Sequence, residues 1–118
     1  MRIATTVAFL SFAAAGAAVA APQVSDVDYL KASRCKGLAA SSLGAGMDTT
    51  QIDAFLKREG GTRLEFIVQK GEAEQVRARR EARQADRQAR LTAELQGACA
   101  VYLGGGAEVA GQHGQPSS

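Results

Sequence analysis

The apolar residues Ile52, Phe55 and Leu56 recur at helical spacing on one face and predict a helix over 49–59, and start signals predict an earlier helix over 26–40. Ser25 precedes the first helix and Asp48 precedes the second. Both side chains can accept hydrogen bonds from the free N–H groups of a helical first turn. A Gly-Gly pair follows residue 59 and predicts the end of the second helix, because glycine adopts the left-handed backbone that often ends helices.

The longest helical pattern extends over 63–103. Thr62 and Glu65 have the spacing of a capping box, and no proline follows before Pro116. At 1.5 Å per residue this helix spans about 60 Å. The segment LEFIV, 64–68, has the composition of a strand, but a lone strand lacks a partner in this chain. We therefore predict an all-α fold: a small helical hairpin or three-helix domain with one long C-terminal helix.

One side of the long helix carries small residues at alternating spacings of three and four, as in the seam of a helical hairpin or coiled coil. These residues are Ala78, Ala82, Ala85 and Ala89. We expect the two short helices to run antiparallel to the long one, stacked end to end. The linker 41–47 then lies opposite the alanines, unless a bend near Gly71 shortens the span. If neither covers them, the alanines form a seam for a partner protein or a second copy.

The opposite side of the long helix carries four arginines, namely Arg80, Arg83, Arg87 and Arg90. The simpler interpretation is a solvated face, as charged residues at helical spacing usually are. The sharper one is a contact with an anionic partner: lipid phosphate, lipopolysaccharide, a polyanion or an acidic protein. Nucleic acid is not expected, because no aromatic side chain lies between the arginines to stack on a base.

The start of the chain has the layout of an export signal. A positive Met1-Arg2 precedes an uncharged stretch over 3–20 that ends in Ala-Val-Ala. This pattern predicts a bacterial secretory signal peptide over 1–20, cleaved after Ala20, and a periplasmic or secreted protein with no transmembrane segment after cleavage. An uncleaved membrane anchor is the alternative, although alanine is only weakly apolar.

Two cysteines, Cys35 and Cys99, allow one intrachain pairing. In an exported protein we expect them to form a disulfide, which a chain-entropy model values at about 4 kcal/mol. Such a link matters in a small domain, because a short chain buries only a limited core.

Charge and composition point to one small, nearly neutral domain over 21–103. The chain has 14 Lys and Arg against 12 Asp and Glu, and removal of the leader takes away Arg2. The end, 104–118, is rich in Gly, Gln and Ser and predicts a disordered tail, which contains the only histidine, His113.

No catalytic, cofactor-binding or metal-binding motif is present in the sequence. The histidine lies in the tail and the cysteines are expected to pair, so we predict that the protein is not an enzyme. The remaining interpretation is a binding or structural module of the cell envelope. A periplasmic holdase-like chaperone and an inhibitor of a secreted enzyme are the alternatives.

Overall fold

The computed structural model describes residues 23–106, and these residues form an all-α fold, as predicted. The predicted signal peptide and most of the predicted tail lie outside the described residues. The elements in chain order are α1 (Asp26–Ala39), η1 (Ser42–Gly44), α2 (Thr50–Gly60), α3 (Glu65–Glu81), η2 (Ala85–Arg87), α4 (Gln88–Gln96) and α5 (Ala100–Leu103).

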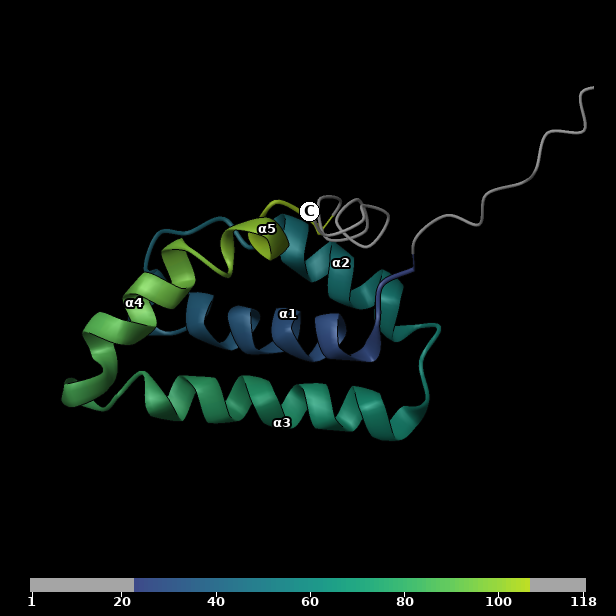
Figure 1. Cartoon of the computed structure of the whole chain (residues 1–118), viewed down its shortest axis with the longest axis horizontal. Helices are drawn as coiled ribbons and strands as arrows, with labels where there is room; N and C mark the ends of the chain where they lie inside the picture. The colour runs from purple at the N-terminus through teal and green to yellow at the C-terminus, as the bar shows by residue number, and fades with distance from the viewer. Residues whose placement is uncertain (1–22, 107–118) are drawn as a thin grey trace, which may run out of the picture.

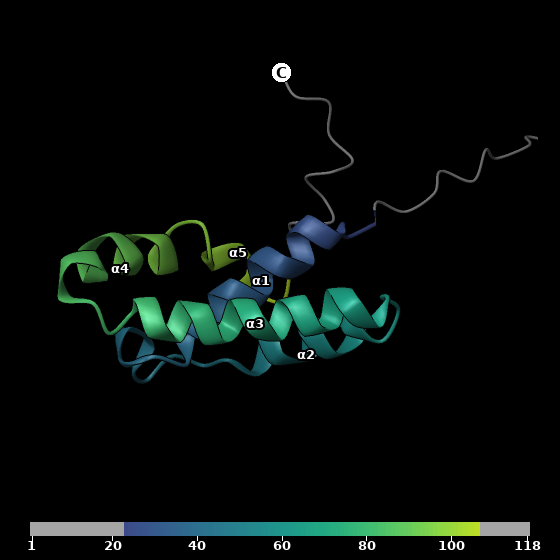
Figure 2. The same cartoon turned by 90° about the horizontal axis from the view of Figure 1, so that it is seen from below.

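Helix α1 lies at the centre and contacts each of the other α-helices (Figure 1). Helix α3 covers one side of it, while α2, α4 and α5 lie on the other (Figures 1 and 2). Helices α1 and α3 run in the same direction, which corrects the expectation for the first helix, whereas α2 runs antiparallel to α3 as expected (Figure 1). Helix α4, which follows the reversal after α3, runs antiparallel to α1, as α2 does (Figure 1).

The first turn of α1 is held as the sequence predicts, whereas α2 begins one residue later than predicted, behind Thr49, whose side chain makes no capping hydrogen bond. The Asp28 N–H donates to Ser25 Oγ at 3.1 Å, and the Ser25 N–H donates to Asp28 Oδ2 at 3.2 Å, which completes a capping box. The Thr50 N–H donates to Asp48 Oδ1 at 2.9 Å. The capping box predicted for Thr62 is wrong, because α3 begins at Glu65 without a side-chain cap.

Small residues allow α1 and α3 to approach closely. A Cβ added at Gly37 of α1 would lie 2.4 Å from the Gln75 carbonyl oxygen and 2.8 Å from the Ala78 Cβ. A Cβ added at Gly71 of α3 would lie 2.8 Å from Ser33 Oγ. Glycine is therefore required on both helices where they meet.

The core fills the space between α1 and its neighbours. Its buried members are Ala32, Cys35, Leu38, Ala39, Ile52, Phe55, Ala78, Ala82, Leu91, Leu95, Cys99 and Tyr102. The predicted disulfide between Cys35 and Cys99 is confirmed and joins α1 to the residue before α5. Because its cysteines are 64 residues apart, it closes most of the domain into one loop.

The prediction of a single long C-terminal helix over 63–103 is wrong. The chain leaves helical geometry after α3, reverses through η2, and breaks again at Gly97 between α4 and α5. In one straight helix Leu91 and Leu95 would point about 220° and about 260° away from Ala78, on the arginine side. The reversal instead buries both leucines against the core, where they are 0% and 1% exposed. Burial of two leucines is worth about 3–6 kcal/mol, which outweighs the helical preference of the arginine-rich segment.

Replacement of Gly37 by alanine tests the close approach of α1 and α3. Alanine favours a helix intrinsically, but here its Cβ forces the two backbones apart, so we expect a loss of about 1–3 kcal/mol in the free energy of unfolding. Gly61→Ala is the matched control, since a Cβ there meets nothing closer than 3.6 Å. Urea unfolding with the disulfide intact measures both, and equal stability of the two variants would contradict the close packing.

Candidate binding surface

The reversal after α3 divides the predicted arginine face into two groups. Arg80 lies in the last turn of α3, and Arg83 follows just beyond its end. Arg87 closes η2, and Arg90 lies in α4. The four arginines therefore do not form one continuous face, because the helix that was to carry them ends at Glu81.

A buried carboxylate collects several of the nearby positive charges. The Glu81 side chain is 11% exposed and accepts from Arg34 Nη2 at 3.0 Å and from Arg77 Nε at 3.1 Å. Arg87 Nη1 lies 4.0 Å from the same carboxylate. Arg34 also binds Glu94 with two hydrogen bonds, of 2.6 and 3.1 Å. This network links α1, α3 and α4 where the chain reverses.

The network also sets the ionisation of Glu81. Burial acts to raise the pKa of this carboxyl, but the hydrogen bond and charge of Arg34, together with Arg77, outweigh it and leave the pKa below its ordinary value. Glu81 is therefore held as an anion inside a cluster of guanidinium groups. Its charge is satisfied within the domain and is not offered to a partner.

Three other arginines remain exposed at the end of α3. We call Arg79, Arg80 and Arg83 the arginine cluster; in residues 23–106 none of them forms an ion pair. Two adjacent surface hollows share Arg79 and Arg83. One is lined by Ala40, Ser41, Ser42, Arg79, Ala82 and Arg83, and the other by Val76, Arg79, Arg80 and Arg83. The predicted face included two of the three arginines, and Arg79 was missed because a straight helix places it to one side.

The predicted alanine seam is also divided by the reversal. Ala78 and Ala82 are 0% and 1% exposed and belong to the core that contains α1. Ala85 and Ala89 are exposed, on η2 and α4. The expectation that small residues allow a close backbone approach holds for Ala78, but the approaching backbone is α1 of the same chain.

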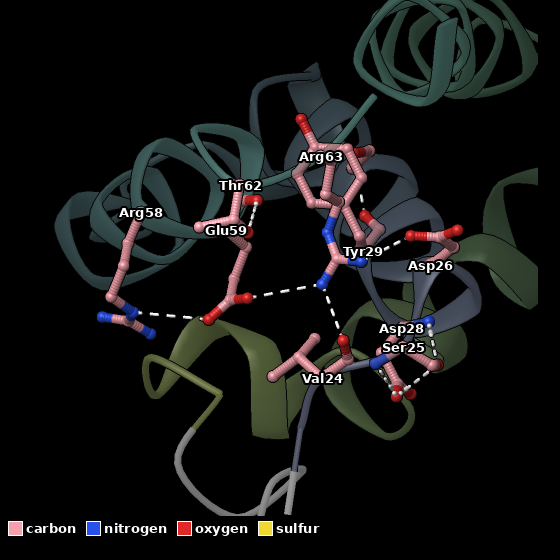
Figure 3. Close-up of polar contacts among 10 residues, drawn as sticks. Val24, Ser25, Asp26, Asp28, Tyr29, Arg58, Glu59, Thr62 and Arg63 are labelled. Carbon is pink, nitrogen blue, oxygen red and sulfur yellow. Dashed lines mark hydrogen bonds and ion pairs between the residues drawn. The ribbon is translucent and has the colours of Figure 1, made fainter. Parts of the chain in front are cut away.

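A second arginine site, at the other end of α3, was not foreseen from the sequence. The Arg63 side chain is 9% exposed and bonds Asp26, the Val24 carbonyl at 2.7 Å, and Glu59 at 3.3 Å (Figure 3). Its guanidinium also lies 5.2 Å from the centre of the Tyr29 ring.

The Arg63 site holds segments of the domain together. Arg63 joins the turn between α2 and α3 to the segment that enters α1, which fixes the chain a few residues after the predicted cleavage point. The partners of Arg63 are separated from it by as many as 39 positions, so no local pattern could have revealed them. Both outer nitrogens of its guanidinium are bonded to groups of the domain itself.

Within 23–106 there is no group of three or more His, Cys, Asp or Glu arranged to hold a metal ion. Across the same residues, no helix combines the length and the apolar character needed to span a membrane. His113 lies outside the described residues.

The pH dependence of stability tests the Glu81 network. Because folding lowers the pKa of Glu81, the unfolded chain takes up a proton first as the pH falls, and the stability due to this carboxylate is lost below its ordinary pKa of 4.5. We expect Glu81→Gln to reduce the loss of stability between neutral and acid pH, measured by urea unfolding. The exposed Glu65→Gln is the control. An acid loss of the same size in the Glu81→Gln variant and in the native chain would contradict the network.

The chain matches no known family model, no curated protein and no solved structure. Its function is therefore inferred from its own residues. Among these, the arginine cluster is the strongest candidate for contact with a partner, because its three charges lack ionic partners within residues 23–106.

Proposed function

We propose that this chain is an exported, non-enzymatic binding module of the bacterial cell envelope, which holds an acidic partner through the arginine cluster. The observation that carries the proposal is the contrast between two sets of arginines in one short segment. Arg77 and Arg87 lie against Glu81, whereas the cluster has no carboxylate beside it in the described residues.

The position of the cluster favours binding over simple solvation. Arg79 and Arg80 belong to α3, which is packed tightly on α1, so their backbone positions are fixed before a partner arrives. Guanidinium groups bind carboxylates and phosphates with two parallel hydrogen bonds, and three of them around shared hollows can hold an anionic surface. Fixed positions also reduce the entropy lost on binding.

Two observations support export. The leader pattern over 1–20 is that of a secretory signal. The Cys35–Cys99 disulfide is of the kind that persists in oxidising compartments and is rare in the cytosol.

The alternative functions have less support from the surface. Association through the alanine seam requires Ala78 and Ala82, which α1 already covers. A holdase-like chaperone needs a broad apolar surface, but large exposed apolar side chains are few in residues 23–106: Val27, Met47, Leu64, Phe66 and Val76. An inhibitor of a secreted enzyme remains compatible as a special case, in which the acidic partner is an enzyme.

Processing of the leader tests the export half of the proposal. When the full chain is expressed in a bacterium, we expect the protein recovered from the periplasm or the medium to begin at Ala21. Intact mass and N-terminal sequencing measure this directly. Protein that stays in the cytosol or the membrane with residues 1–20 attached would contradict export.

Neutralising the arginine cluster tests the binding half. We expect the variant carrying Arg79→Gln, Arg80→Gln and Arg83→Gln to bind a fluorescent poly-glutamate peptide at least about tenfold more weakly than the native chain, because the charge-assisted hydrogen bonds are lost. Fluorescence anisotropy at low ionic strength measures the affinity.

The matched control carries Lys31→Gln, Lys57→Gln and Arg90→Gln, which remove three exposed positive charges elsewhere. None of these three residues forms an ion pair in the described part of the chain. The net charge of the control equals that of the cluster variant. If both variants lose affinity equally, the binding follows net charge and the cluster has no special role.

A further inference from the structure

The outer face of α3, which points away from α1, carries its charges in a definite order. No other helix of the described chain covers this face (Figures 1 and 2). The first half of the face is acidic and polar, its middle is apolar, and its end is basic. The exposed residues in this order are Glu65, Gln69 and Glu72, then Ala73 and Val76, then the arginine cluster. Val76 is 48% exposed although it is a large apolar residue.

The order is symmetric about Val76. Glu72 and Arg80 each lie four residues from it, about 6 Å along the helix axis, and Gln69 and Arg83 each lie seven residues away, about 10 Å. At 100° per residue, all four positions fall within about 40° of Val76 around the helix. The Arg83 N–H still donates to the Arg80 carbonyl at 3.2 Å, so the final turn keeps Arg83 near this face.

A two-fold axis through Val76 therefore brings opposite partners together. When a second α3 lies antiparallel on the first, each side chain stays on its own side of the line through the two Val76 residues. Glu72 lies about 40° to one side of Val76 and Arg79 about 60° to the same side, so Glu72 of each copy faces Arg79 of the other, and Gln69 lies near Arg83. Two Val76 side chains and two Ala73 side chains then meet near the axis. Such self-complementarity is what an isologous dimer interface requires, since each contact occurs twice.

We infer that the outer face of α3 binds a second copy of this chain in antiparallel orientation, with the arginine cluster of each copy against the acidic first half of α3 in the other. This inference rests on the proposed function and names the acidic partner. It uses no alanine-seam contact, and the charges it needs are available: neither Glu72 nor Arg79 forms an ion pair within residues 23–106.

The physical character of the face predicts a weak and salt-sensitive dimer. Exposed ion pairs contribute little each, and mobile ions screen them. The apolar centre is small, so the charge pairs decide orientation and register more than affinity. We expect the dissociation constant to rise at least about tenfold between ionic strengths of about 0.02 M and about 0.5 M.

Reversal of single charges on the oxidised mature chain, 21–118, tests the inference by sedimentation equilibrium. Glu72→Arg places two positive residues opposite each other, and Arg79→Glu places two negative ones, so each variant alone is expected to be monomeric where the native chain dimerises. An equimolar mixture of the two variants restores opposite charges and is expected to form a heterodimer. The variant with both substitutions is expected to dimerise again.

The control is Lys57→Glu on α2, an exposed reversal away from α3, which is expected to dimerise as the native chain does. The inference is overturned if the native chain remains monomeric at low ionic strength and high concentration, or if the mixture of reversed variants does not associate. Circular dichroism verifies that each variant keeps its helices.

Failure of this inference is distinguishable from failure of the proposed function. A monomeric chain that still binds poly-glutamate through the arginine cluster keeps the proposed function and removes the dimer. A monomeric chain whose cluster variant binds poly-glutamate as well as the native chain removes both.

Discussion

The close approach of α1 and α3 is the constraint on which the rest of the structure depends. Gly37, Gly71 and Ser33 leave no room for larger side chains between the two backbones, and Ala78 completes the contact from α3. Because these residues are small, the contact buries little apolar surface and contributes little hydrophobic stabilisation. Its effect is to let the backbones of α1 and α3 approach closely. The larger apolar groups must then be buried on the other side of α1, which is why α4 has to return across it.

The same constraint sorts the charges. Once α3 ends and the chain reverses, Glu81 lies inside the corner and draws Arg34, Arg77 and Arg87 toward it. The outward side of α3 keeps the arginines that this carboxylate does not reach. The fold thus divides one basic stretch of sequence into two sets of arginines. One set is paired with Glu81 inside the domain, and the other, the arginine cluster, is exposed and has no ionic partner in the described residues.

Local signals in the sequence predicted the helical class, the disulfide, the start of the first helix and, to within one residue, the start of the second, because capping and pairing depend on nearby residues or on only two cysteines. The reversal after α3 contains no glycine or proline that would predict it from the sequence, and it results from the burial of Leu91 and Leu95. The sequence did contain a signal for the reversal. A straight helix would expose both leucines to solvent among the arginines, which is unfavourable for large apolar side chains. Arg63 was unpredictable for a different reason, because its partners are distant in sequence.

Concentration-dependent 1H–15N NMR spectra of the mature chain test the central claim, that the outer face of α3 binds a second copy of the chain. At low ionic strength the account predicts that the amide signals of Gln69, Glu72, Val76 and Arg79 shift with protein concentration, while those of α4 do not, and that high salt removes the shifts. Signals of α3 that stay constant over the series, or shifts centred on α2 or α4, would contradict it.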